Sequence, residues 1–216
     1  IGDSGIAWNE VAQLNISNST KPSSELTIHH AKINKGTIKR LDTLTLKVDP
    51  GGRSETTLHH SATHLLHASL KEVLGDHIKQ AGSLVTADRL RFDYTHFSPL
   101  SQAEKHRIEE QVNQKIRENL TVSTCELPME KAVKEGAVAL FGEKYGDDVR
   151  VVSMGDFSKE LCGGTHTTAT GNIGLFKIVS EGGIASGVRR IEAVAGKSAY
   201  FAMQEENKTL TSIRSI

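Results

Sequence analysis

Four side chains with metal-ligating chemistry occur in this sequence as two pairs of equal spacing. His60 and His64 stand at positions i and i+4 in the stretch HHSATH. Cys162 and His166 have the same spacing in the stretch CGGTH. On a helix, side chains four residues apart project from one face, one turn from each other. Three imidazoles and one thiolate suit a tetrahedral zinc site, so the pairs predict one site if the fold joins them.

Each pair also has an ordinary interpretation. The H-x-x-x-H spacing is common by chance on helices, and a buried thiol can lie next to a surface imidazole without any metal. The occurrence of both pairs in one chain favours metal binding. The adjacent glycines, Gly163 and Gly164, are expected to let the backbone bend so that Cys162 and His166 face inward.

Two further histidines of the same segment are weaker ligand candidates. His67 shares the helix face but lies about 10 Å along the axis from His60, so we expect it to support the ligands from behind or to lie at the surface. His59 points about 100° away from His60 and is a poor ligand candidate.

The kind of zinc site is only partly determined by these residues. A zinc protease of the H-E-x-x-H type needs a glutamate where this chain has Ser61. Four protein ligands close the coordination shell, whereas catalytic zinc usually keeps one position open for water or substrate. The number of ligands alone therefore favours a structural site.

The first part of the chain is rich in strand patterns. Period-two alternation predicts strands at residues 25–33 and 43–49. The composition of residues 15–25, NISNSTKPSSE, predicts a loop. Proline and paired glycines at residues 49–54, DPGGRS, indicate a boundary. We therefore expect a small, β-rich and barrel-like subdomain over residues 1–52.

The rest of the chain intersperses helices with hairpin-like strands. Apolar residues recur at helical spacing through residues 54–75, and a second helix begins at Ser101 with Glu104 completing a capping box. This pattern predicts an α+β fold over residues 53–197, with helices packed on an antiparallel sheet. Residues 198–216 are expected to begin a helix that leads out of the domain.

Composition limits the function classes. The 216 residues include 26 Lys+Arg and 26 Asp+Glu, for a formal net charge of +0. A protein that wraps nucleic-acid phosphates would be clearly basic, so we expect nucleic-acid contact to be local. No apolar run is long enough to span a bilayer, which predicts a soluble protein. The cysteines, Cys125 and Cys162, form no disulfide scaffold and favour a reducing compartment; Cys125 is expected to be a buried thiol.

Five motifs in order resemble the editing region of bacterial alanyl-tRNA synthetases. They are LHHSATHLLHASLKEVLG (58–75), QAGSLV (80–85), RLRFDY (89–94), ALFGEKYGDDVRVVSMGDFSKELCGGTH (139–166) and GVRRIEAVAG (187–196). The opening IGDSG is similar to the end of the glycine-rich motif that precedes this region. The start without methionine and the end within a helical pattern favour a segment of the synthetase over a free-standing editing protein.

The resemblance implies a fold of the synthetase second-additional, or editing, domain type, and a function. His60, His64, Cys162 and His166 match the zinc-binding positions of the family. Family members hydrolyse the ester of seryl- or glycyl-tRNA(Ala) formed in error. An alanine pocket cannot exclude smaller glycine and excludes serine only modestly, so a second hydrolytic site is needed. The ATP-dependent aminoacylation core would lie upstream, and a coiled coil with a tRNA-binding domain would follow.

Other positions have two readings each. Gln80 matches a pocket residue of the family, or is a solvated surface group. Thr63 is expected either to reach a substrate hydroxyl or to bond its own backbone. Asp93 is a candidate for orienting a ligand imidazole or water, or serves a turn. Arg189 and Arg190 are candidates for contact with tRNA, and alternation places them on opposite faces.

The resemblance therefore implies a zinc-dependent aminoacyl-tRNA deacylase in the cytoplasm. Its expected partners are the acceptor end of tRNA(Ala) carrying serine or glycine and the rest of the synthetase chain, with no membrane and no DNA. Two alternatives stay open: a free-standing trans-editing deacylase, and a non-catalytic tRNA-docking module with structural zinc.

Overall fold

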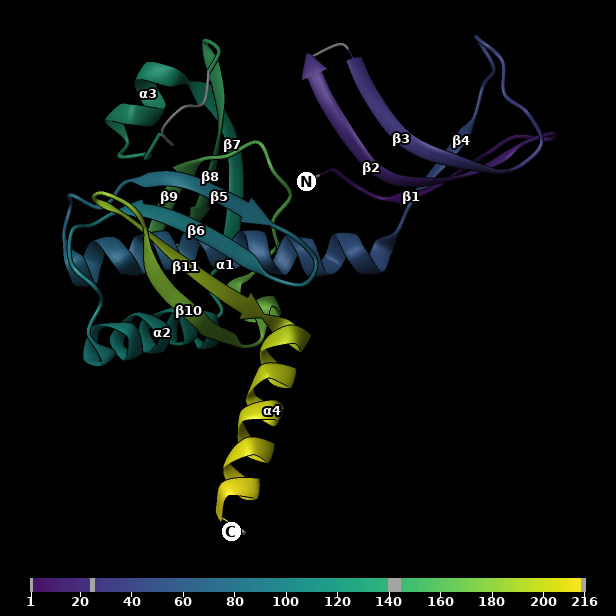
Figure 1. Ribbon diagram of the computed structural model, residues 1–216. Helices are drawn as coiled ribbons and strands as arrows, with labels where there is room; N and C mark the ends of the chain where they lie inside the picture. Colours follow the sequence, from purple (N-terminus) through teal and green to yellow (C-terminus); the bar gives the residue numbers. More distant parts are fainter. Residues whose placement is uncertain (1, 24–25, 140–144, 215–216) are drawn as a thin grey trace. The chain divides into compact units, whose positions relative to one another are not determined.

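A computed structural model describes residues 2–23, 26–139 and 145–214 of the chain (Figure 1). The chain divides into two compact units, Ile1–Thr56 and Thr57–Ile216. The stretch LFGEK of the longest motif, residues 140–144, lies outside the described residues, as does the end of the loop predicted at residues 15–25. The boundary expected at residue 52 and the separate segment from residue 198 stay predictions.

The first unit is an antiparallel sheet with strand order β3-β2-β1-β4. Its strands are β1 (Gly5–Trp8), β2 (Gln13–Ser23), β3 (Leu26–Lys35) and β4 (Thr45–Val48). Among the described residues the sheet does not close on itself, so the barrel-like form is not confirmed.

The loop predicted from the polar composition of residues 15–25 is wrong for its described part. Residues 15–23 continue β2, which pairs with β1 on one side and β3 on the other. Leu14 and Ile16 are buried on one face of β2. Pairing with β3 over most of this length, together with pairing to β1 up to Ile16, outweighs the turn preference of the Asn, Ser and Pro residues.

The second unit confirms the α+β class with antiparallel sheets. One sheet has the order β10-β11-β6-β5 and the other β7-β8-β9. The strands are β5 (Gln80–Val85), β6 (Leu90–Thr95), β7 (Val122–Pro128), β8 (Asp148–Met154), β9 (Ser158–Leu161), β10 (Phe176–Ala185) and β11 (Val188–Ala195).

The helices are α1 (Pro50–Leu74), α2 (Gln102–Arg117), α3 (Met129–Lys134) and α4 (Gly196–Arg214), with a 3₁₀ turn η1 at Thr170–Ile173. The predicted capping box of α2 is confirmed: the Glu104 amide donates to Ser101 Oγ, and the Ser101 amide donates to Glu104 Oε2. Within the described part of the chain, no helix is long and apolar enough to cross a membrane.

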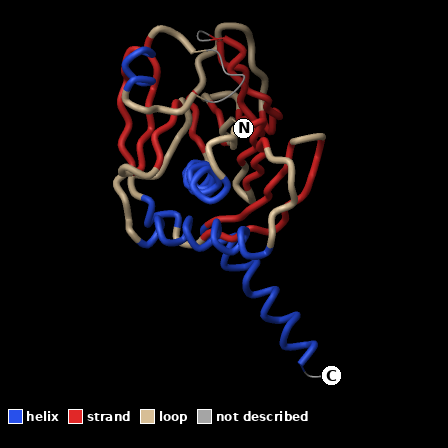
Figure 2. The backbone as a smooth tube through the Cα atoms, turned by 90° about the vertical axis from the view of Figure 1, so that its left-hand side faces the viewer, coloured by secondary structure: helices blue, strands red, loops and turns tan. Residues whose placement is uncertain are grey.

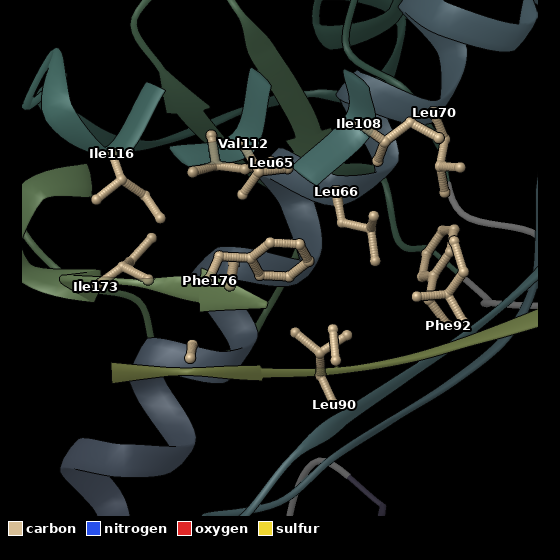
Figure 3. Close-up of a cluster of buried hydrophobic side chains, with 14 of the residues drawn as sticks. Leu65, Leu66, Leu70, Leu90, Phe92, Ile108, Val112, Ile116, Ile173 and Phe176 are labelled. Atoms are coloured by element: carbon tan, nitrogen blue, oxygen red, sulfur yellow. The ribbon is translucent and has the colours of Figure 1, made fainter. Parts of the chain in front are cut away.

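Helix α1 is the central element of the second unit. Figure 2 looks nearly along its axis. Leu65, Leu66 and Leu70 on this helix are fully buried in a core shared with α2 and with strands β6, β10 and β11 (Figure 3). Burial of each leucine stabilises the fold by about 1.5–3 kcal/mol. The histidines of α1 are therefore carried by a well-anchored helix.

The expectation that Cys125 is a buried thiol is wrong. Cys125 lies in β7, an edge strand of the three-stranded sheet, and its side chain is exposed. Its neighbours Thr124 and Glu126 are exposed as well. Apolar alternation in sequence does not show whether another layer covers an edge strand.

Candidate metal centre

The structure brings the two predicted pairs together. The ligating atoms of His60, His64, Cys162 and His166 lie within 4.8 Å of one another. Cys162 Sγ is 3.4 Å from His60 Nε2 and 3.3 Å from His166 Nε2. Tetrahedral zinc with Zn–S near 2.3 Å and Zn–N near 2.0–2.1 Å would separate sulfur and nitrogen by about 3.5 Å. The cluster therefore has the composition and spacing to hold one metal ion.

Helix α1 presents its two histidines from one face. Their ring centroids are 5.3 Å apart, as expected for residues one turn apart. His64 is buried, whereas His60 is half-buried, as is His166 from the loop. The cluster is thus closed on the side of His64 and more open on the side of the other two imidazoles.

The loop after β9 is held against its neighbours by hydrogen bonds from two directions. Arg150 on β8 donates through Nη1 to the carbonyl oxygens of Cys162, at 2.8 Å, and Gly164, at 2.5 Å. The Thr167 amide donates to Ser61 Oγ on α1, at 3.0 Å. Ser61 stands where a zinc protease would have a glutamate, and here it binds the loop to the helix that carries the histidines.

Gly164 is required for close approach, not for an unusual backbone angle. A Cβ atom at this position would lie 2.1 Å from His60 Cε1, which is sterically impossible without displacement of the ring. A Cβ atom on Gly163 would meet nothing within 4 Å. Neither glycine has a positive φ angle. The expectation that both glycines are needed to bend the backbone is therefore wrong. Gly164 is needed because a side chain there would occupy the place of the His60 ring.

This difference predicts unequal effects of two neighbouring substitutions. Gly164→Ala should displace His60, destabilise the fold by about 1–3 kcal/mol through overpacking, and weaken metal binding. Gly163→Ala is the matched control and should leave both properties nearly unchanged. Thermal melting and metal titration of the two variants measure the effects, and equal behaviour would contradict the packing argument.

Glu160 is a buried part of the site that the sequence reasoning missed. Its Oε2 lies 2.7 Å from His64 Nδ1, and its Oε1 lies 2.9 Å from His67 Nδ1. His67 is buried and supports the cluster from behind, as one of its two interpretations predicted. His59 Nε2 accepts from the Ala195 amide, away from the cluster. In the sequence, the one feature that could have pointed to Glu160 is its position two residues before Cys162.

The ionisation of the site favours metal binding. Burial opposes ionisation of Cys162, but hydrogen bonds from His166 and His60 lower its pKa to about 3, so the thiolate is present at neutral pH. Burial together with the nearby His60 lowers the pKa of His166 to about 4 against the opposing effect of the thiolate.

Burial lowers the pKa of His64, but the Glu160 carboxylate and the Cys162 thiolate together outweigh it and raise the pKa to about 10. Among the described residues, His64 Nε2 is buried and has no hydrogen-bond partner. Burying such an atom without a partner is costly. A bound cation would satisfy it in place of a second proton, so the residues present fit a zinc ion.

The two candidate pocket residues lie on different elements: Thr63 is on α1, between His60 and His64, and Gln80 is on β5. Thr63 is buried, and its hydroxyl donates to the His59 carbonyl at 2.8 Å, the local backbone bond expected as its ordinary role. Gln80 begins β5, is half-buried, and pairs with Tyr94 across the sheet. Their roles with substrate stay predictions.

The carboxylate that contacts a ligand imidazole is Glu160, whereas Asp93 is paired with an arginine; orientation of a water by Asp93 stays a prediction. Arg190 donates to both Asp93 oxygens, at 2.7 and 2.8 Å, because the two residues are cross-strand partners of β11 and β6. Asp93 serves no turn, since it lies within the strand. Arg189 is buried and paired with Glu181. The placement of the arginines on opposite faces agrees with the alternation of β11.

The motifs have counterparts in known proteins. Residues 149–192, which include Cys162 and His166, match the family described as the threonyl and alanyl tRNA synthetase second additional domain. The chain is 51% identical over 206 residues to an alanine–tRNA ligase of Desulfosudis oleivorans, covering 95% of this chain and 24% of the ligase. It is 50% identical over 213 residues to that of Alkaliphilus oremlandii, covering 99% and 24%.

A third relative extends the match to the whole chain. The alanine–tRNA ligase of Desulforamulus reducens is 49% identical over 216 residues, 100% of this chain and 25% of the ligase. The chain thus spans about a quarter of the length of these relatives. The resemblance to the editing-domain segment of alanyl-tRNA synthetases that the motifs indicated is thereby confirmed.

Proposed function

We propose that this chain is the zinc-dependent editing part of an alanyl-tRNA synthetase and hydrolyses the ester of seryl- or glycyl-tRNA(Ala). The observation that supports this most is the convergence of His60, His64, Cys162 and His166 from segments about 100 residues apart. Donors of these types at this spacing suit a zinc ion. The relatives carry the name alanine–tRNA ligase, which points to tRNA(Ala) as the partner.

In this proposal, zinc supplies Lewis-acid polarisation of an ester carbonyl or activation of water. The chain contributes an ordered frame for that chemistry. Arg150 and Ser61 hold the loop that carries Cys162, and Glu160 holds His64. The half-buried His60 and His166 form the side of the cluster that a substrate can approach.

The acceptor end of tRNA is the part of the partner that this segment is proposed to engage. The formal net charge of +0 fits a local contact better than a long phosphate-binding surface. Arg189 and Arg190 are already paired with carboxylates, so neither is a free cation for phosphate. The remaining synthetase domains would supply ATP-dependent aminoacylation and most tRNA affinity, and the cytoplasm remains the predicted location.

A non-catalytic docking module with structural zinc is the second candidate. It is favoured by the presence of four protein ligands, which would fill a tetrahedral shell. A free-standing trans-editing deacylase would have the same chemistry as the first proposal and differs only in the gene context.

Hydrolysis of three charged tRNAs separates these candidates. The zinc-loaded chain is incubated with seryl-, glycyl- and alanyl-tRNA(Ala), and the remaining ester is measured over time. Editing predicts accelerated loss of serine and glycine while alanine stays attached. Uniform loss would contradict the specificity, and no loss above the spontaneous rate would favour the docking module.

Thr63 provides a prediction about serine recognition. Its hydroxyl donates to the His59 carbonyl, so its oxygen can still accept a hydrogen bond from a serine hydroxyl. An unmet hydrogen bond of this kind costs about 1–3 kcal/mol, so Thr63→Val should slow seryl-tRNA hydrolysis roughly 5- to 150-fold. Glycyl-tRNA hydrolysis should fall much less, because glycine has no hydroxyl. Losses of equal size for both substrates would assign Thr63 to helix support.

A further inference from the structure

Glu160 is a carboxylate enclosed between two imidazoles. The side chains of Glu160, His64 and His67 are 5%, 4% and 2% exposed. Each carboxylate oxygen contacts one Nδ1 atom, at 2.7 Å for His64 and 2.9 Å for His67. A carboxylate at this depth is costly without hydrogen-bond partners, and the two imidazoles supply one partner for each oxygen.

We propose that Glu160, held in place by His67, is a positioning residue of the metal centre that fixes His64 as a ligand. The inference rests on the proposed function only for the presence of the metal. In the neutral ring that binds a metal, a proton held on Nδ1 by Glu160 leaves the lone pair on the other ring nitrogen. That atom, Nε2, is the buried one without a hydrogen-bond partner among the described residues. The carboxylate therefore selects the ring orientation and tautomer that metal binding requires.

His67 holds the carboxylate and is not a fifth ligand. Its Nδ1 is engaged by Glu160 Oε1, and its ring packs against Phe92 of β6 with centroids 5.2 Å apart. With both oxygens occupied, the Glu160 carboxylate cannot rotate away from His64. The i, i+3 spacing of His64 and His67 on α1 lets one carboxylate bridge them.

The test is zinc affinity, measured by competition between the purified chain and a chelating indicator. In Glu160→Gln, the amide has one acceptor and one donor, whereas the Nδ1 atoms of His64 and His67 need two acceptors. Zinc affinity should fall by about 10- to 100-fold, as for other supporting partners of metal ligands. Glu126→Gln, an exposed glutamate on β7, is the matched control and should bind zinc like the unchanged chain.

A second pair of variants decides the matter if Glu160→Gln fails to fold. Asparagine places an amide donor near the position of Nδ1, so His67→Asn should keep most zinc affinity. His67→Leu leaves one carboxylate oxygen unpaired and should weaken zinc binding. The Co²⁺ absorption spectrum of His67→Leu should keep its thiolate band, because the four ligands are unchanged. Equal zinc affinities for the His67 variants would overturn the proposal.

The outcomes separate this inference from the proposed function. Unchanged affinity in Glu160→Gln would overturn the positioning role while leaving the zinc-dependent editing proposal intact. Weakened zinc binding in Glu160→Gln, together with no hydrolysis of mischarged tRNA by the unchanged zinc-loaded chain, would support the positioning role and contradict the editing proposal. Absence of zinc binding by the unchanged chain would overturn both.

Discussion

Replacing Cys162 by serine should remove both the metal and the hydrolytic activity. Zinc content should fall from one ion per chain to near none, because the thiolate is the strongest donor of the cluster and lies within 3.4 Å of two imidazoles. Loss of a preorganised electrostatic group in an active site costs about 10²- to 10³-fold in rate. We expect seryl-tRNA hydrolysis to fall by at least that factor.

The exposed Cys125 provides the control for this substitution. It is the other cysteine of the chain and lies on β7, outside the four-residue cluster. Cys125→Ser should keep zinc content and hydrolysis at the level of the unchanged chain. Elemental analysis and deacylation rates are measured on the same preparations. Full activity in a zinc-free Cys162→Ser preparation would contradict a catalytic role of the metal.

Removal of zinc by a chelator should lower the melting temperature without unfolding the second unit. A ligand present at 100 times its Kd stabilises the folded state by about 2.7 kcal/mol. For a protein of this size, each kcal/mol corresponds to about 2–4 °C. The expected decrease is therefore about 5–11 °C. The fold should persist because α1 is anchored in an apolar core and the Cys162 loop by Arg150 and Ser61.

The Cys162→Ser variant is the control for the chelator. With no zinc to lose, its melting temperature should be the same with and without chelator. An unchanged melting curve of the zinc-loaded chain would show that zinc does not bind the native state preferentially. Complete unfolding at room temperature would show that the loop needs the metal to form, contrary to its hydrogen bonds.

Local features of the fold were predictable from the sequence because they depend on nearby residues. The capping box of α2 and the shared face of His60 and His64 follow from helical spacing. The meeting of α1 with the loop at Cys162 follows from no local rule, since it joins positions 102 residues apart. The donor chemistry of the two pairs and the resemblance to the editing region indicated it.

The expectations that the structure overturns depend on strand pairing between distant residues and on which side chains other elements cover. The polar end of β2 resembles a loop, but pairing with β3 makes it a strand. Cys125 resembles a core residue, but its strand is an edge with an exposed face. Glu160 resembles an ordinary strand glutamate until His64 and His67 are placed on either side of it.

The most direct test of the zinc-dependent editing proposal is the rate of seryl-tRNA(Ala) hydrolysis by one preparation of the unchanged chain, measured as purified, after metal removal, and after addition of one equivalent of zinc. The proposal predicts hydrolysis before removal, loss of at least about 100-fold after it, and recovery with zinc through His60, His64, Cys162 and His166. Equal hydrolysis by the metal-free chain in the presence of excess chelator would contradict it.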